Sequence, residues 1–107
     1  NICYLKENKR RIKAIMPVHV LGNMSDMDKI VQLSQKYNLA IVEDSTEALG
    51  AFYKNQHAGT FGKMGCFSFN GNKIMTTGGG GMIVTSDEKL AKRAKHLTTQ
   101  AKSDSFE

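Results

Sequence analysis

The sequence predicts an α/β protein, because apolar segments of strand length alternate with two amphipathic helical segments. Apolar side chains recur at helical spacing over residues 26–37 and again over 86–101. The stretch LAIVED, residues 39–44, stays apolar until two acids end it, which is typical of a strand buried on both faces of a parallel sheet. Four strands and two helices cannot cover both faces of such a sheet, so we expect further structure at one or both ends.

The remaining elements follow from turn and capping residues. Ser25 is a good N-cap for the first helix and Asn38 a plausible C-cap, whereas Thr85 and Glu88 fit a capping box at the second helix. Pro17 ends the apolar run of the first strand. The strands are expected at 11–20, 39–44, 66–69 and 81–85, with a loop or short helical turn at 45–51 and an exposed polar excursion at 53–65.

Composition narrows the function classes. The 107 residues are 40% hydrophobic and 23% charged, with a net charge of +5. No apolar run approaches the length of a membrane span, and the start has neither a secretory leader nor an initiator methionine. We therefore expect a cytoplasmic protein that does not bind membranes, of which this chain is an internal part. The basic residues are scattered, which disfavours a nucleic-acid-binding module but leaves it as an alternative.

Metal binding and disulfide formation have little support in the sequence. Cys3 and Cys66 lie far apart, and no ligand spacing typical of a zinc site is present. The three histidines are dispersed along the chain. We predict no metal site.

Two groups of residues could carry chemistry. Glu43 and Asp44 end a predicted buried strand, where α/β sheets bind ligands, although they could simply be solvated acids. Lys73 is flanked by apolar residues, which would desolvate its ammonium and favour a nucleophilic amine, although most lysines lie on the surface. The glycines at 78–81 match neither a P-loop nor a dinucleotide fingerprint. They predict close backbone approach or positive φ angles, with a flexible turn as the alternative.

A nucleophilic lysine combined with a carboxylate from another strand end suits pyridoxal phosphate. This cofactor needs a lysine for its imine and an acid at its pyridine nitrogen. Asp44 could supply the acid, and a hydroxyl near Lys73, such as that of Ser68, could bind the phosphate.

The strings PVHVLGNMSDMDKI, VEDSTEALGA and GTFGKMGCFSFNGNKIMTTGGGGMIVTSDE resemble the DegT-type sugar aminotransferases over roughly residues 12 to 103. The resemblance implies a fold-type-I pyridoxal-phosphate enzyme, with residues 1–107 forming part of its large, cofactor-binding domain. That domain has a mixed, mostly parallel sheet with flanking helices. It also implies a protein about three and a half times longer, a homodimer with a shared active site, and a 107-residue segment that binds cofactor poorly and is inactive alone.

The resemblance assigns roles to five residues. Lys73 matches the lysine that forms the imine and then transfers the proton, and Asp44 matches the acid at the pyridine nitrogen. Thr46 matches the small residue packed under the ring, and Ser68 matches a phosphate-binding serine. Glu47 occupies a place near the phenolic oxygen that is often glutamine, which leaves its role open.

The implied activity is transfer of an amino group from glutamate to a nucleotide-linked keto-sugar. The strings HVLGNMSDMDKI and FSFNGNK look most like the subgroup that acts on UDP-4-keto-6-deoxy-N-acetylhexosamines. Two alternatives remain on the same scaffold: a non-catalytic regulatory relative and a sugar dehydratase. Some dehydratase relatives have histidine in place of the lysine, so Lys73 favours amination.

Overall fold

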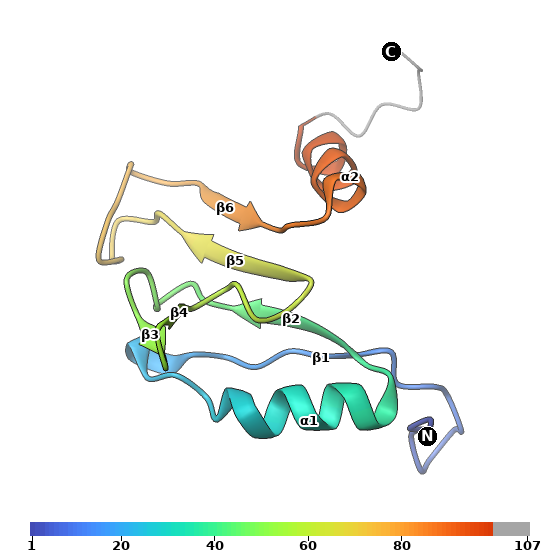
Figure 1. Cartoon of the computed structure of the whole chain (residues 1–107). Helices are drawn as coiled ribbons and strands as arrows, with labels where there is room; N and C mark the ends of the chain where they lie inside the picture. The colour runs from blue at the N-terminus through green and yellow to red at the C-terminus, as the bar shows by residue number, and fades with distance from the viewer. Residues whose placement is uncertain (100–107) are drawn as a thin grey trace.

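The computed structural model describes residues 1–99, and these form the α/β fold that the sequence predicts. A mixed sheet contains β1 (Ala14–Ile15), β2 (Ala40–Asp44), β5 (Met64–Ser68) and β6 (Gly81–Val84), in the order β1-β2-β5-β6 (Figure 1). The first three strands run parallel, and β6 is antiparallel to β5. Helix α1 (Met27–Tyr37) connects β1 to β2, and α2 (Glu88–Thr98) follows β6. The prediction of a mixed, mostly parallel sheet with helices is confirmed.

The first strand is shorter than the predicted 11–20, because only Ala14–Ile15 form regular strand pairs. The chain nevertheless continues alongside β2: the Asp44 N–H donates to the Pro17 carbonyl and the His19 N–H donates to the Asp44 carbonyl. Pro17 can occupy this place because β1 is an edge strand and the proline presents only its carbonyl to β2. A 3-10 turn, η1 (Val20–Gly22), then leads to α1.

Both predicted N-caps are wrong, because an aspartate one or two positions further along accepts the helical N–H groups. Asp26 caps α1 by accepting from the Lys29 N–H, whereas Ser25 turns its hydroxyl to the Val18 carbonyl. Asp87 caps α2, and Thr85 instead donates to the Lys63 carbonyl. A carboxylate offers more acceptor positions than a hydroxyl and also suits the helix dipole.

The other end of α1 agrees with the sequence. Asn38 has φ 52° and ψ 54°, and its N–H donates to the Ser34 carbonyl, so the predicted C-cap is confirmed. The end of α2 is only partly comparable with the prediction, because positions 100 and 101 lie outside the described residues.

The predicted exposed excursion at 53–65 is only partly correct. It contains most of a hairpin of β3 (Phe52–Tyr53) and β4 (Gln56–His57), and its last two residues belong to β5. Between these elements Ala58 and Gly59 are buried. Backbone groups make the internal contacts of this polar segment. The pattern of its side chains therefore does not reveal that part of it is buried.

A single buried carboxylate holds this segment against the sheet. Glu43 is fully buried, and its Oε1 accepts the N–H groups of Phe61 (2.6 Å) and Gly62 (2.8 Å). Its Oε2 accepts the Gly59 N–H (2.8 Å) and lies 3.2 Å from His19 Nε2. Glu43 therefore has a structural role, and it is neither an acid in a ligand-binding crevice nor the solvated acid that the sequence left open.

The buried His19 ring completes this arrangement. Its Nδ1 accepts the N–H of Ser25 at 3.2 Å, so that nitrogen carries no proton. In the neutral ring Nε2 must then carry the proton and donate it to Glu43. The carboxylate thus receives four hydrogen bonds, which offset the cost of its burial.

We expect Glu43→Gln to destabilise the full-length protein by about 2–5 kcal/mol, because the amide nitrogen would face N–H donors that now have acceptors. Thermal unfolding measures the loss, and hydrogen exchange at residues 59–62 locates it. The matched control is Glu88→Gln, which breaks an exposed pair with Lys92 and should change the midpoint little. Unchanged protection of the 59–62 amides in Glu43→Gln would contradict the assignment.

Close backbone contact at Gly65 is a second requirement of this packing. A Cβ at Gly65 would overlap the carbonyl oxygen and Cα of Gly59, both of which are backbone atoms. Gly65→Ala should therefore lower the unfolding midpoint clearly, whereas Gly79→Ala, which has open space around it, should be tolerated. Equal midpoints for the two variants would show that the segment can move away from β5.

Candidate functional site

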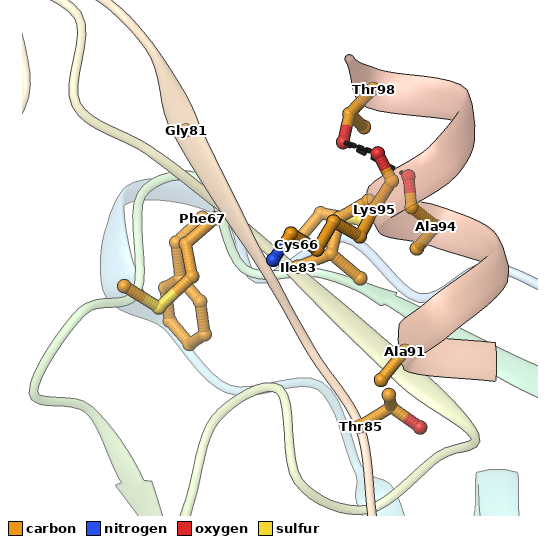
Figure 2. A pocket seen from close by; sticks show the side chains of 10 residues that line it. Cys66, Phe67, Gly81, Ile83, Thr85, Ala91, Ala94, Lys95 and Thr98 are labelled. Carbon is orange, nitrogen blue, oxygen red and sulfur yellow. Dashed lines mark hydrogen bonds between the residues drawn. The ribbon is translucent and has the colours of Figure 1, made fainter. Parts of the chain in front are cut away.

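A hollow of about 650 Å³ lies between β6 and α2 but lacks a reactive arrangement of groups. Figure 2 shows Cys66, Ile83 and Lys95 on the side of β6 that faces α2, with Phe67 on the other side of β6. Cys66 and Lys95 are the titratable residues of its lining. The hollow does not include any of the five predicted site residues, so we place the candidate site elsewhere.

Lys73 lines a second, smaller cavity of about 180 Å³ beyond the end of β5. Its side chain is only 17% exposed, and its Nζ lies 3.6 Å from Glu47 Oε1. The remaining lining residues are Glu47, Leu21, Asn72 and Ile74. The cavity is smaller than a typical cofactor pocket, so residues 1–99 form part of a site rather than a whole one.

The connection between β5 and β6 determines where Lys73 lies. The Phe69 N–H donates to the Gly80 carbonyl, and the Phe69 carbonyl accepts from the Thr77 N–H, so the loop is closed at its base. Gly78 and Gly80 have φ angles of 84° and 93°, and a Cβ at Gly81 would approach the Phe67 carbonyl oxygen to 2.6 Å. Positive φ angles and close approach, as predicted for this glycine run, are both confirmed.

The expected apolar surroundings are found only in part, because Leu21 and Ile74 line the cavity of Lys73. Ile74 and Met75, which follow it, are mostly exposed. The nearest charged group is instead the Glu47 carboxylate. Sequence adjacency was a poor guide here, because the residues of a tight turn point in different directions.

Asp44 and Ser68 lie at the carboxyl ends of two neighbouring parallel strands. Asp44 pairs with Cys66 in the register of β2 and β5, and Ser68 follows Cys66 by two residues, so all three share one face of the sheet. Asp44 Oδ1 accepts the Thr46 N–H at 3.1 Å, which ties these two predicted residues together. Asp44, Thr46 and Ser68 are not part of the cavity lining around Lys73.

The Asp44 carboxylate affects the thiol beside it. Burial raises the pKa of the Cys66 thiol, and the negative charge of Asp44 raises it further, because both disfavour the thiolate. Cys66 and Cys3 are both free thiols. This effect follows from the register of β2 and β5, which pairs Asp44 with Cys66.

Leu21 is a member of the site that the sequence did not indicate. Its N–H donates to Glu47 Oε2 at 2.8 Å, and its backbone has φ 52° and ψ 31°. A leucine rarely adopts this left-handed conformation, so no propensity or periodicity would have identified it. The five predicted site residues were recognised by their polar or charged side chains, whereas Leu21 is aliphatic.

Neither a cluster of metal ligands nor a membrane-spanning helix is found in the described part of the chain. Among residues 1–99, no three His, Cys, Asp or Glu side chains gather closely enough to hold a metal ion. Neither of the described helices is long and apolar enough to cross a membrane.

The chain is similar to a known protein family and to several known proteins. Residues 6–107 match the DegT/DnrJ/EryC1/StrS aminotransferase family. A putative pyridoxal phosphate-dependent aminotransferase of Bacillus subtilis, EpsN, is 46% identical, covering 91% of this chain and 25% of that protein. GDP-perosamine synthase of Caulobacter vibrioides is 49% identical over 84% of this chain and 24% of its own.

Solved structures agree with the sequence comparison. The Helicobacter pylori aminotransferase PseC, involved in the biosynthesis of pseudoaminic acid, superimposes with a TM-score of 0.80 at 35% identity. The match covers 89% of this chain and 26% of that one. The chain therefore spans about a quarter of the length of the curated relatives it matches.

The shared face of Asp44 and Cys66 can be tested by thiol chemistry. In the cofactor-free, full-length protein, Asp44→Asn removes a negative charge and should lower the pKa of Cys66. Alkylation of Cys66 by iodoacetamide at pH 8 should then accelerate roughly two- to tenfold, measured by peptide mass spectrometry. Asp28→Asn on α1 is the matched control and should leave the rate unchanged. An unchanged rate in Asp44→Asn would contradict the placement.

Proposed function

Because the chain belongs to the DegT/DnrJ/EryC1/StrS aminotransferase family, we propose that the whole protein transfers an amino group from glutamate to a nucleotide-linked keto-sugar, with pyridoxal phosphate as cofactor. The observation that carries this proposal is the mostly buried Lys73 amine beside Glu47. Lys73 lies in the loop that follows β5, and β5 pairs with β2, the strand that ends in Asp44. This placement supplies a lysine and an acid at one edge of a sheet, as the cofactor requires.

The donor set of the described residues fits pyridoxal phosphate. Lys73 offers an amine in a partly enclosed cavity. Asp44 Oδ1 is occupied by the Thr46 N–H, whereas Oδ2 accepts no hydrogen bond from residues 1–99 and could accept one from a pyridinium nitrogen. The Ser68 hydroxyl could donate to a phosphate oxygen, Thr46 would lie against the ring, and Glu47 would lie near the phenolic oxygen.

Bound pyridoxal phosphate supplies an electron sink for the carbanion formed at the reacting carbon. Lys73 would remove the proton from that carbon of the amino donor and return it one step later, acting in turn as general base and general acid. Asp44 would keep the pyridine nitrogen protonated by accepting its N–H. The Glu47 carboxylate, 3.6 Å from Lys73 Nζ, would stabilise the lysine whenever it is protonated.

We further propose UDP-4-keto-6-deoxy-N-acetylhexosamine as the sugar substrate and a homodimer as the active form. Support for the sugar comes from the strings HVLGNMSDMDKI and FSFNGNK. One relative is named for a GDP-linked sugar, so the nucleotide should be varied first in any assay. The partial site formed by residues 1–99 is consistent with additional walls from other parts of the protein or from a second subunit.

The proposal predicts that Lys73→Arg, which keeps the positive charge but lacks an amine that can bind the cofactor and transfer the proton, lowers turnover by at least about 10³-fold. The full-length wild-type protein should show a cofactor absorbance near the visible edge that disappears when glutamate is added. The variant should not show this loss of absorbance. Lys92→Arg on the exposed face of α2 is the matched control. A cofactor absorbance that glutamate leaves unchanged, with no amination of any keto-sugar, would instead indicate a non-catalytic relative, and turnover by Lys73→Arg would refute the proposed mechanism.

A further inference from the structure

Leu21 forms a hydrogen bond with a predicted site residue through its backbone. Its side chain is 80% exposed, so it buries little apolar surface. Its backbone has φ 52° and ψ 31°, a left-handed conformation that is unfavourable for a leucine and persists only where other contacts impose it. The N–H of this residue donates to Glu47 Oε2 at 2.8 Å. A strained backbone at position 21 thus presents one N–H group to the candidate site.

The turn around Leu21 is held on both sides. Before it, the His19 ring is buried, and the His19 N–H donates to the Asp44 carbonyl at 3.0 Å. After it, the Gly22 N–H donates to the His19 carbonyl, and the Ser25 N–H donates to His19 Nδ1. Because both sides are fixed, a different φ angle at Leu21 would turn the peptide group that carries its N–H away from the acceptor. The left-handed conformation is therefore the condition under which this hydrogen bond forms.

Glu47 connects this N–H group to the lysine. Its Oε2 accepts the Leu21 N–H, and its Oε1 lies 3.6 Å from Lys73 Nζ. A donor on one oxygen restricts the rotation of the carboxylate, and a carboxylate in a fixed position attracts the ammonium to one place in the cavity. The position of the amine is therefore coupled to the backbone conformation at position 21.

We propose that the turn at Leu21 is a positioning element for the free Lys73 amine, and that it acts through Glu47. This inference rests on the proposed function, in which Lys73 removes a proton from the amino donor and returns it. A base transfers a proton efficiently only when it stays within hydrogen-bond reach of the reacting atom. The backbone conformation at position 21 therefore matters more for the reaction than the chemical type of its side chain.

Two substitutions at position 21 separate conformation from chemistry. Leu21→Ile keeps an aliphatic side chain of the same size but adds a branch at Cβ, which strongly disfavours a positive φ angle. Leu21→Asn makes the side chain polar but suits the left-handed conformation. The matched control is Leu33→Ile, because Leu33 is also exposed but lies in the regular helix α1. It should behave as the wild type in both measurements.

The first measurement is the acetylation of Lys73 in the cofactor-free, full-length protein at pH 8, followed by peptide mass spectrometry. An ammonium held beside a carboxylate reacts slowly, so Lys73 in Leu21→Ile should be acetylated about three- to tenfold faster than in Leu21→Asn. In the Glu47→Gln background the two variants should react equally fast, because the charge through which the turn acts is missing. Equal rates with Glu47 present, or a difference that persists in the Glu47→Gln background, would overturn the proposal.

The second measurement uses the protein loaded with pyridoxal phosphate. At saturating glutamate, the cofactor absorbance should disappear about tenfold more slowly in Leu21→Ile than in Leu21→Asn. Faster acetylation together with a slower reaction distinguishes positioning of the amine from its exposure alone. If glutamate leaves the wild-type spectrum unchanged, the proposed function fails and this inference fails with it. If the wild type responds to glutamate and the two variants respond equally fast, only the positioning role is overturned.

Discussion

The fold depends on the burial of one carboxylate, that of Glu43. A buried charge is costly unless it is fully hydrogen-bonded, and Glu43 meets this condition with three backbone N–H groups and His19. These donors come from segments on either side of β2 in the sequence. Because removing any donor leaves a buried charge less well solvated, the segment at 59–62 and the turn around His19 have few alternative positions. The carboxylate thus converts two irregular segments into fixed parts of the structure.

The same constraint reaches the proposed site through the backbone. Successive side chains of a strand point to opposite faces, so holding Glu43 on one face of β2 directs Asp44 to the other. The chain that carries His19 also pairs with the backbone of Asp44, and two residues later the Leu21 N–H reaches Glu47. The structural acid, Glu43, and the acid that we propose holds the cofactor, Asp44, are therefore adjacent in sequence but lie on opposite faces of the sheet. The sequence shows two neighbouring acids, and only the packing distinguishes their roles.

Features that neighbouring residues determine could be predicted from the sequence. Features that depend on contacts between residues far apart in the sequence could not. The extents of α1 and β2 and the C-cap at Asn38 follow from periodicity, apolarity and the left-handed preference of asparagine. By contrast, the four partners of Glu43 lie up to 24 positions away and three of them are backbone groups. Lys73 and Glu47 were predicted to be site residues, but their contact across 26 positions was not predicted. Leu21 escaped notice because its role depends on backbone conformation.

The two contacts of the Glu47 side chain explain why a carboxylate suits position 47. A neutral amide could accept the Leu21 N–H equally well, so that hydrogen bond alone does not require a charge. The second oxygen lies 3.6 Å from Lys73 Nζ, so a negative charge at position 47 attracts the ammonium. An amide there would hold Leu21 but would not compensate Lys73. The carboxylate performs both tasks, so a single side chain links the turn at Leu21 to Lys73.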